Sequence, residues 1–467
     1  LEPATTKLIG RCPEFSKVET NEAIQSAHDA FQLYQTTSAR QRSRLLRKWY
    51  ELVIHHQEDL SVLITMENGK PLSNARDEVA YAASFLEWFS EEAPRTYGDV
   101  IPASNHGSQV LTLKEPLGVC ALITPWNFPA AMITRKAGAA LAAGCTVVIK
   151  SPAETPFTVN ALVELAYRAG FPRGIINVVT ALSNTVEVVH TLTSSPLVHK
   201  VSFTGSTNVG KILMRQCAET TVKKISLELG GNAPFIVFED ADLDAAVDGV
   251  IICKFRSSGQ TCVSANRIYV HDSVYAEFAS KLAARVQRDF VVGNGLTTPG
   301  VTHGPLIHEK ALEKTLAHIR DAVTRGATIA SGGSAMPQLG PHFLEPTIVT
   351  DMTHDMQVAC DETFGPVAGL FRFTTEKEVI ALANSTDMGL AGYFYSRNIQ
   401  RLWRVARALQ VGMVGVNTGL ISDPASPFGG VKSSGFGREG GRYGIEEYMT
   451  TKTITLGGLE PLAQSRL

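Results

Sequence analysis

Short apolar segments alternate with helical stretches along the middle of the chain. The helical stretches include residues 131–143 and 158–169. The apolar segments lie at residues 118–124, 146–150, 175–179, 200–204 and 225–229. Strands that alternate with helices are typical of parallel βαβ units. The pattern therefore predicts an open α/β domain.

A second series of apolar segments begins near Pro234. These segments lie at residues 233–238, 267–270, 368–372, 391–395 and 412–416, with helical patterns between them. We interpret the series as a second α/β domain. The Gly, Ser and Pro residues of 331–340 indicate a surface turn within it.

The two ends of the chain have different patterns. Residues 19–92 carry apolar side chains at helical spacing among charged ones, which predicts amphipathic helices packed on a larger body. Residues 110–119 are expected to form a strand, a turn around Lys114-Glu115-Pro116 and another strand. Residues 451–456 alternate as a further strand does. Such isolated β segments predict an interface element.

The composition indicates an ordinary globular protein of two or three domains. Of the 467 residues, 44% are hydrophobic and 19% are charged, and the net charge is −2. Because there is no excess of basic residues, we expect no nucleic-acid partner. Every apolar stretch is interrupted well before the roughly 20 residues that a bilayer span requires, so we also expect no membrane partner.

The cysteines indicate reduced thiols. All seven lack a CxxC pairing and a His/Cys cluster at zinc-ligand spacing, so neither disulfides nor a metal site is expected. This pattern favours a reducing compartment, the cytoplasm or the mitochondrial matrix. Residues 1–10 lack the features of a signal peptide, and a first residue other than Met is compatible with a targeting segment having been removed.

A glycine turn at residues 201–211 is a candidate phosphate site. It ends a predicted strand at Gly205 and opens a predicted helix, whose free N–H groups can receive a phosphate. The segment also matches GxxxxGK, but Ile212 stands where a P-loop needs Ser or Thr for magnesium. The remaining alternative is that Gly205 and Gly210 only shape a tight turn.

Three side chains are candidates for carbonyl chemistry. Cys262 follows small polar residues that suggest an accessible turn, where a thiol can act as a nucleophile. Glu228 is flanked by leucines at a strand end, which would raise its pKa toward that of a useful base. Asn127 lies between two prolines, and its amide is a candidate donor to an oxyanion. The alternatives are an inert thiol, a capping glutamate and a turn asparagine.

Five short motifs stand in the order and spacing of one enzyme superfamily. They are TPWNFP (124–129), FTGS (203–206), ELGG (228–231), GQTC (259–262) and ETFGP (362–366). With these motifs the chain resembles the aldehyde dehydrogenase superfamily over nearly its whole length. The resemblance implies an enzyme in which Cys262 attacks an aldehyde and Asn127 and the Cys262 N–H hold the oxyanion. Hydride passes to a nicotinamide, and Glu228 activates the water that hydrolyses the thioester.

The resemblance also implies an NAD(P) site. Lys150 is expected at the adenosine ribose, Ser206 at the pyrophosphate, and Glu362 with Phe364 at the nicotinamide ribose. The full set of expected cofactor residues is Thr124, Trp126, Lys150, Ala153, Glu154, Gly205, Ser206, Gly230, Glu362 and Phe364.

Three longer runs resemble the succinate-semialdehyde dehydrogenases. They are residues 131–148, KFRxxGQTC (254–262) and GLIS (419–422). Arg135 and Arg256 match two arginines that clasp the substrate carboxylate in that group, and Ser422 matches their hydroxyl partner. Phe428 is expected in the same pocket. The alternatives are that the arginines form structural ion pairs, and that the substrate is glutarate semialdehyde or another aliphatic or aromatic aldehyde.

The chain departs from the wider family at two positions. Many NAD-specific members have a glutamate three residues after the lysine that matches Lys150, where it repels a 2′-phosphate. This chain has Ala153 there and Glu154 one residue later, so we expect NADP or NAD, with NADP favoured. Ser264 replaces a second cysteine that closes a regulatory disulfide in some relatives, so that switch is expected to be absent.

The resemblance implies the aldehyde dehydrogenase fold, an α/β class fold. It comprises a Rossmann-like cofactor domain over 1–107 and 121–233, an α/β catalytic domain over 234–432, and a β oligomerisation element from 108–120 and 433–467. A homodimer or homotetramer is implied, in which the C-terminal strand extends a partner's sheet.

Two rival functions are disfavoured by the residues present. A CoA-acylating relative would not need the Glu228 base. A relative that has lost catalysis and serves only as a structural or binding protein is not expected to keep Cys262, Glu228 and Asn127 together.

Overall fold

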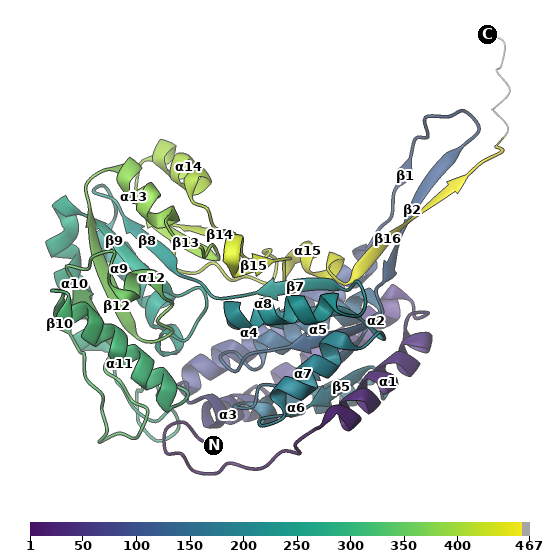
Figure 1. Cartoon of the computed structure of the whole chain (residues 1–467), viewed down its shortest axis with the longest axis horizontal. Helices are drawn as coiled ribbons and strands as arrows, with labels where there is room; N and C mark the ends of the chain where they lie inside the picture. Colours follow the sequence, from purple (N-terminus) through teal and green to yellow (C-terminus); the bar gives the residue numbers. More distant parts are fainter. Residues whose placement is uncertain (460–467) are drawn as a thin grey trace, which may run out of the picture.

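The computed structural model describes residues 1–459, which form two α/β bodies and a projecting arm (Figure 1). The first body is built on a six-stranded sheet, parallel except at its β15 edge. Its strands are, in spatial order, β15 (Gly435–Phe436), β7 (Lys224–Glu228), β6 (Val198–Thr204), β3 (Val119–Ile123), β4 (Thr146–Lys150) and β5 (Ile176–Val179). Every side chain of β3 and β4 is buried because helices cover both faces of the sheet.

Helices cover the first sheet in two layers. One face packs against α2 (Ala39–His55), α3 (Gln57–Asn68), α4 (Leu72–Glu92), α5 (Ala131–Ala143) and α6 (Pro156–Ala169). The other packs against α1 (Lys17–Tyr34), α7 (Thr185–Ser194) and α8 (Thr207–Ala218), while α15 (Gly441–Glu446) contacts α5. Capping boxes at Ser16 and Ser38 begin α1 and α2, so the predicted N-terminal helices are confirmed.

The second body is a seven-stranded sheet with one antiparallel edge strand, β10. Its strands are, in spatial order, β10 (Thr328–Ser331), β11 (Thr347–Thr350), β12 (Val367–Phe373), β9 (Ala265–His271), β8 (Ala233–Val237), β13 (Ala391–Tyr395) and β14 (Met413–Val416). The sequence pattern missed β10 and β11, which are only four residues long each. Residues 332–340 form the expected surface turn after β10.

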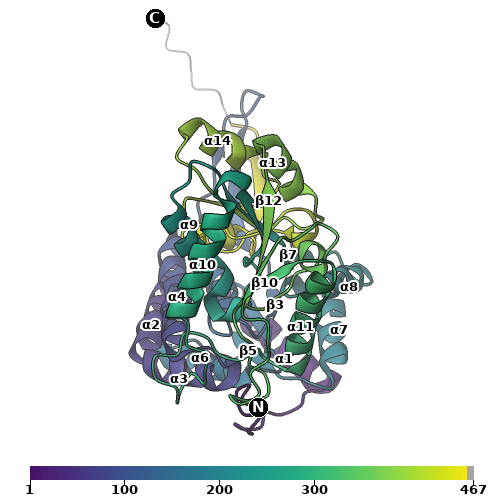
Figure 2. The same ribbon diagram turned by 90° about the vertical axis from the view of Figure 1, so that its left-hand side faces the viewer.

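Helices also flank the second sheet on both sides. One face packs against α9 (Leu243–Val250) and α10 (Tyr275–Asp289). The other packs against α11 (Glu309–Thr324), α12 (Gln357–Cys360), α13 (Glu376–Asn384) and α14 (Ile399–Ala408). Seen from this end of the molecule, α9 and α10 lie on one side of β12 and α11 on the other (Figure 2). Short turns η1 (Ala93–Arg95), η4 (Asp272–Val274) and η5 (Lys432–Ser434) join the elements.

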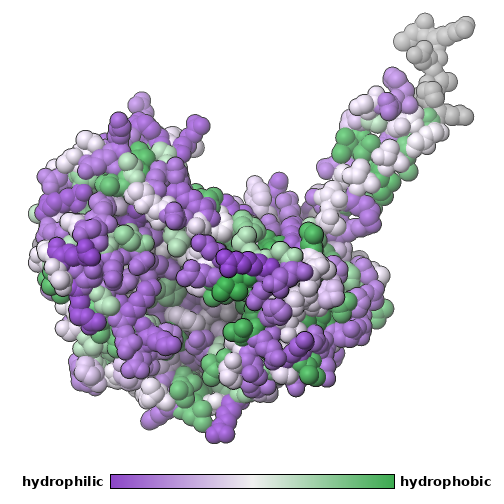
Figure 3. Space-filling model, viewed as in Figure 1, coloured by the Kyte–Doolittle hydropathy of each residue, from purple (hydrophilic) through white to green (hydrophobic). Residues whose placement is uncertain are grey.

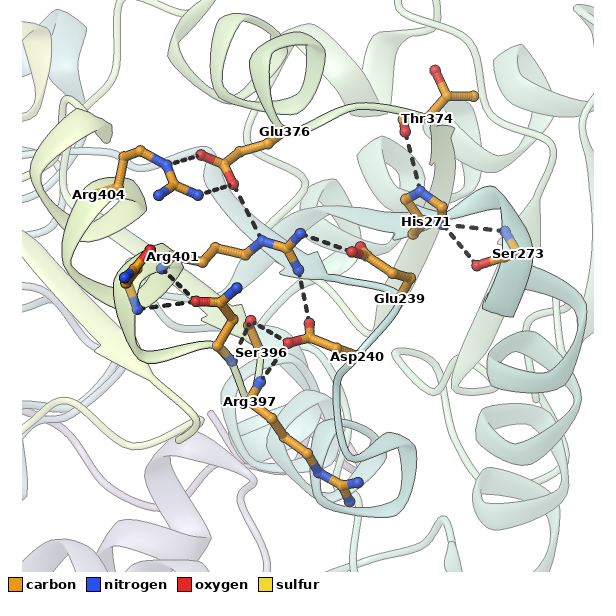
Figure 4. A network of polar contacts seen from close by, with 12 residues as sticks. Glu239, Asp240, His271, Ser273, Thr374, Glu376, Ser396, Arg397, Arg401 and Arg404 are labelled. Carbon is orange, nitrogen blue, oxygen red and sulfur yellow. Dashed lines mark hydrogen bonds and ion pairs between the residues drawn. The ribbon is translucent and has the colours of Figure 1, made fainter.

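An ion-pair network fastens α14 to its neighbours. Arg401 donates to Glu239 at 2.7 Å and to Asp240 at 2.8 Å, both after β8. Glu376, at the start of α13, accepts from Arg401 at 3.2 Å and also from Arg404 (Figure 4). One guanidinium thus links three carboxylates from two segments, which fixes the outer helix on the sheet.

The arm is a three-stranded antiparallel sheet in the order β1 (Val100–Ile101), β2 (Gln109–Pro116) and β16 (Met449–Leu456). The prediction of a turn around Lys114-Glu115-Pro116 is wrong. Those residues pair with Thr451, Thr450 and Met449, and this partner keeps them extended, with the proline tolerated at the strand end. The chain turns instead at Gly118, whose φ is +127°.

The segments expected in the β element divide differently from the prediction. Val119 and Cys120 belong to β3 of the first sheet, not to the arm. Within 433–448, β15 pairs with β7 and α15 lies on α5, because these residues return to the first body before β16 leaves it. Residues 460–467 of the predicted element lie outside the described residues.

Candidate active site

A cavity of about 480 Å³ lies where the two bodies meet. The first body contributes the loops that follow the carboxyl ends of β3, β6 and β7, which is where parallel sheets place their ligands. Most of the predicted site residues line this cavity. They are Asn127, Glu228, Cys262, Arg135, Arg256, Ser422, Phe428, Trp126, Gly205, Ser206, Gly230, Glu362 and Phe364.

The remaining cofactor candidates lie outside that cavity. Thr124 and Lys150 stand at the carboxyl ends of β3 and β4. Ala153 and Glu154 line a separate cavity of about 210 Å³. Burial lowers the pKa of Lys150, and the charge of Glu154 raises it by a smaller amount. The two side chains are therefore close enough for their charges to interact.

Cys262 reaches the cavity through a strained, packed turn. A π-helical turn, η2 (Ile251–Phe255), and a tight turn, η3 (Arg256–Gly259), precede it, and Ser257 and Ser258 have φ of 52° and 55°. Such left-handed non-glycine residues are costly and cluster at functional sites.

The expectation that this turn is accessible is wrong for most of it. Ser257, Ser258 and Gln260 are buried, and the last two have hydrogen-bond partners within the protein. Ser258 Oγ donates to the Gly304 carbonyl at 2.8 Å, and the Gln260 side chain accepts from the Ile307 N–H at 3.0 Å. Arg256, Cys262 and Val263 are the half-buried residues of this segment, and all three line the cavity.

The resting thiol of Cys262 is neutral. Burial raises its pKa to about 12, and the nearby Arg135 opposes this rise only in part. Glu362 and Glu228 raise the pKa further. To act as a nucleophile, this thiol would have to lose its proton first, because only the thiolate attacks carbonyl carbon well.

Glu228 is a buried carboxyl at the end of β7. Neither of its oxygens has a hydrogen-bond partner within residues 1–459. Burial, followed by the charge of Glu439, raises its pKa well above the ordinary value, as its leucine neighbours predicted. A carboxyl of raised pKa is a stronger base once it is ionised, which suits the activation of water.

The amide of Asn127 is oriented by two hydrogen bonds. Its Oδ1 accepts from the Phe128 N–H at 3.1 Å, and its Nδ2 donates to the Gln260 carbonyl at 3.0 Å. Because the amide nitrogen carries two hydrogens, one remains for an oxyanion. Gln260 lies two residues before Cys262, so this bond ties the donor to the nucleophile's own loop.

The glycines of the motifs interlock at the cavity. A Cβ on Gly231 would lie 2.3 Å from the Cys262 carbonyl oxygen, and one on Gly259 would lie 2.2 Å from the Gly365 carbonyl oxygen. A Cβ on Gly230 would lie 3.0 Å from Glu362 Oε2. The motifs ELGG, GQTC and ETFGP therefore meet in space, and their glycines allow that approach.

The two candidate substrate arginines differ in their surroundings. Arg135 is buried, and its Nε donates to Glu439 at 2.6 Å while its guanidinium lies 4.2 Å from the Phe428 ring centroid. Arg256 has no ion-pair partner within residues 1–459, and its guanidinium lies 5.4 Å from the Phe128 ring centroid. The alternative of a structural ion pair thus applies to Arg135 Nε, which binds Glu439. Of the two arginines, Arg256 is the one without an ion pair within residues 1–459.

Sequence reasoning missed several residues of the site. Tyr81 of α4 lines the cavity, and Glu439 binds both Arg135 and Lys136 beneath it. Tyr81 lies in a helix whose pattern indicated only packing. Glu439 is 304 positions from Arg135, and neither spacing nor a local motif connects them.

Comparison with known proteins decides the family. The model of the aldehyde dehydrogenase family matches residues 1–454. The chain belongs to this family. It is 54% identical over 457 residues to a succinate-semialdehyde dehydrogenase of Schizosaccharomyces pombe that is named for NADP(+), covering 98% of this chain and 91% of that one. Identity is also 54% to a glutarate-semialdehyde dehydrogenase of Pseudomonas aeruginosa, with 98% and 93% covered.

Solved structures agree on the fold. The crystal structure of succinate-semialdehyde dehydrogenase from Burkholderia pseudomallei matches with a TM-score of 0.96 at 52% identity, covering 98% of this chain and 93% of that one. The predicted aldehyde dehydrogenase fold is thereby confirmed. None of the helices within residues 1–459 has the length and apolar character needed to cross a membrane. Those residues also contain no group of three or more His, Cys, Asp and Glu side chains placed to hold a metal ion.

The expected cofactor residues of this aldehyde dehydrogenase fit a dinucleotide. The buried hydroxyls of Thr124 and Ser151, at the ends of β3 and β4, have no partner within residues 1–459. Ser206 lines the cavity beside Gly205 and caps the start of α8, an end of a helix that favours phosphate. Such unsatisfied donors and a helix start suit ribose and phosphate groups.

The nicotinamide end of the cleft is also suitably built. Trp126 and Phe364 form an apolar wall, with ring centroids 5.7 Å apart, and Phe364 is held at a φ of 55°. Glu362 Oε1 accepts from the Gly231 N–H at 3.1 Å, and burial raises the pKa of this carboxyl to about 7. A carboxylate beside an apolar wall suits a ribose hydroxyl next to a flat ring.

Proposed function

We propose that this aldehyde dehydrogenase oxidises succinic semialdehyde to succinate with NADP+ as its preferred oxidant. The observation that carries the proposal is Arg256, a cation that lines the same cavity as Cys262 and has no ion-pair partner in the described part of the chain, residues 1–459. Ser422, also in the lining, supplies a hydroxyl for the same carboxylate. A guanidinium fork binds a carboxylate through two parallel hydrogen bonds, which would orient a short semialdehyde with its carbonyl toward Cys262.

The first chemical step is addition of the Cys262 sulfur to the aldehyde carbon. The thiol loses its proton, the C–S bond forms, and the carbonyl oxygen becomes an oxyanion that the free Asn127 Nδ2–H stabilises. NADP+, when bound, accepts the hydride that leaves the same carbon. Thr124, Lys150, Ser206 and Glu362 would hold it, and Trp126 with Phe364 would face the nicotinamide.

The second step releases the acid. Glu228, as a carboxylate, removes a proton from water, which attacks the thioester carbon and restores the Cys262 thiol as succinate leaves. Glu228 is buried and its oxygens have no hydrogen-bond partner among residues 1–459, which supports this role because such a setting makes the carboxylate basic. A base for water also argues against transfer of the acyl group to CoA.

NADP+ is proposed on two grounds. Position 153 is alanine, and an acidic side chain at this position would repel a 2′-phosphate. The Schizosaccharomyces pombe relative is named for NADP(+). Glu154 is near enough to Lys150 to raise its pKa, so some activity with NAD+ is expected as well.

Glutarate semialdehyde is the second candidate substrate. An equally similar relative is named for it, and its carboxylate is only one methylene farther from the aldehyde. The decisive experiment measures initial rates of cofactor reduction with succinic semialdehyde, glutarate semialdehyde and butanal. A kcat/KM highest for succinic semialdehyde and lowest for butanal supports the proposal. Equal values for all three would remove the role of Arg256 and leave a general aldehyde dehydrogenase.

We also propose a homodimer or homotetramer in a reducing compartment, the cytoplasm or the mitochondrial matrix. On its outer side β16 has no partner strand within residues 1–459, so it is a ready edge for another subunit. All seven cysteines are unpaired, which supports a reducing environment.

A further inference from the structure

The turn between α3 and α4 holds the backbone of the loop that carries Asn127. Asn68 Nδ2 donates to the Trp126 carbonyl at 3.0 Å, and Lys70 Nζ donates to the Asn127 carbonyl at 2.8 Å. Both side chains are buried. Two successive carbonyls of the loop are therefore fixed from one direction, while the Asn127 amide is fixed by the Gln260 carbonyl from another.

Glu78 of α4 fixes the other end of the same loop. Its Oε1 accepts from the Ala130 N–H at 2.8 Å and from the Ala131 N–H at 3.5 Å. The residue at the N-cap position of α5 is Ala130, which has no side chain able to cap the helix. Glu78 thus caps α5 from a neighbouring helix, and its charge is favourable at the positive end of the α5 dipole.

Lys70 and Glu78 also bind each other. Their ion pair is sequestered, with side-chain exposures of 1% and 0%. Lys70 Nζ lies 4.1 Å from the ring centroid of Phe128, the residue after Asn127. A buried ion pair contributes little net stability compared with well-packed apolar side chains, because desolvation offsets the attraction. What apolar side chains could not supply is a set of directed hydrogen bonds to the loop.

We propose that Lys70 and Glu78 are positioning residues for the oxyanion donor. Together they fix the loop at the Asn127 carbonyl and at its C-terminal end, and so hold the remaining Asn127 Nδ2–H toward the carbonyl oxygen at Cys262. The inference rests on the proposed role of Asn127 and adds to it the device that orients the amide. Neither side chain lines the cavity, so both act through the loop and not on substrate.

A double-mutant cycle tests this proposal. Lys70→Met/Glu78→Gln removes both charges without leaving one buried alone. In the otherwise unchanged enzyme we expect kcat to fall roughly 10- to 100-fold, because a displaced donor loses most of its effect on the oxyanion. KM for the semialdehyde should change less than about twofold, since substrate binding is made elsewhere. In an Asn127→Ala background, the same two changes should lower kcat no further.

Controls separate positioning from stability. Lys200→Met removes another buried lysine, which does not line the cavity. Lys200 Nζ hydrogen-bonds Ser226 and lies 3.3 Å from Glu447 Oε2. This substitution should lower Tm and leave kcat unchanged. The single variant Lys70→Arg keeps the charge and the donors, so it should retain most of the kcat of the unchanged enzyme. If Lys70→Met/Glu78→Gln does not fold, Lys70→Arg and Glu78→Gln alone are measured in both backgrounds.

The outcomes distinguish this inference from the proposed function. Equal losses of kcat in the Asn127 and Asn127→Ala backgrounds would overturn the positioning role, because the charges would then act independently of the amide. Full activity of Asn127→Ala itself would overturn the proposed oxyanion role first, and the positioning role with it.

Discussion

In the proposed reaction, two side chains of one cavity depend on the same apolar surroundings for different reasons. Cys262 must stay neutral until substrate arrives, and burial raises its pKa to about 12. Glu228 is proposed to accept a proton later, and burial, with no hydrogen-bond partner within residues 1–459, raises its pKa as well. The same apolar setting thus protects the nucleophile from premature reaction and strengthens the base.

The pKa of Cys262 gives a pH prediction for the cofactor-free enzyme. The thiolate is the reactive form, so alkylation by iodoacetamide should accelerate about tenfold per pH unit between pH 7 and pH 9, without a plateau. Rates are followed by mass spectrometry of the Cys262 peptide. A plateau below pH 8 would mean that Arg135 or another cation lowers this pKa far more than the burial raises it.

Replacing Glu228 should separate the two chemical steps. In Glu228→Gln, steady-state kcat should fall by about 10²- to 10⁴-fold, because water loses its base. A rapid burst of about one reduced cofactor per active site should remain, since hydride transfer comes earlier. Stopped-flow absorbance at 340 nm measures both. Loss of the burst together with the steady state would place Glu228 in the first step instead.

The two arginines should respond differently to removal. Arg256→Ala should raise KM for succinic semialdehyde far more than for butanal and leave Tm nearly unchanged, because this cation has no ion-pair partner within residues 1–459. Arg135→Ala leaves Glu439 with one cation fewer in a buried site, so unfolding free energy should fall by about 3–5 kcal/mol. Thermal melts and initial rates of both variants check this. Equal stability of the two variants would contradict the buried-pair assignment for Arg135.

Some residues of the site could be predicted from the sequence and others could not, for reasons that the structure explains. Local composition and strand ends made Cys262, Glu228 and Asn127 only candidates, and the resemblance of their short motifs to the family selected them. Glu439 does not, because its partner Arg135 is far away along the chain and only the fold joins them. Arg135 is also buried in an ion pair with Glu439, and no rule of sequence spacing predicts this burial.

At the scale of elements, the arm is the part least able to stand alone. Three strands project from the first body (Figure 1), and β16 pairs with β2 along its whole length but leaves its other edge open. Hydrophobic side chains gather along the arm and over α8 in the space-filling view (Figure 3). Val100 is 66% exposed and Leu113 is 45% exposed. An unpaired edge with apolar side chains is typical of a subunit contact.

Charges on the arm should weaken association. Val100→Lys/Leu113→Glu should lower the molar mass measured by light scattering after size exclusion, because burying a charge at an apolar contact is costly. Val323→Glu, at a 44% exposed position on α11, is the matched control and should leave the mass unchanged. An unchanged mass for the arm variant would show that assembly uses another surface.

The same arm shows where element prediction failed. The alternation of 110–119 suggested a hairpin because Pro116 resembled a turn residue. In the structure β16, more than 300 positions away, pairs with residues 109–116 and keeps them extended. The central strands were predicted well because β3 and β4 are apolar on both faces, whereas β10 and β11 are short and one of them is mostly exposed.

At the scale of the whole molecule, the active site exists only where the two bodies touch. Gly231, just after the last long strand of the first body, has its α-carbon against the carbonyl of Cys262 from the second. We expect Gly231→Ala to displace the Cys262 turn, because its Cβ would lie 2.3 Å from that backbone oxygen. A backbone atom cannot move aside as a flexible side chain can. Activity should fall about 100-fold or more, since small displacements of a nucleophile are that costly.

A matched glycine makes this test specific. Gly457→Ala introduces the same methyl group where nothing lies within 4 Å, so it should leave both kcat and Tm unchanged. In Gly231→Ala the iodoacetamide labelling of Cys262 should change together with kcat, because the turn that buries the thiol has moved. Full activity with an unchanged labelling rate would mean that the two bodies can separate slightly without losing the site. The contact of ELGG with GQTC would then be packing alone, and alignment of the nucleophile would depend on the bond between Asn127 and Gln260.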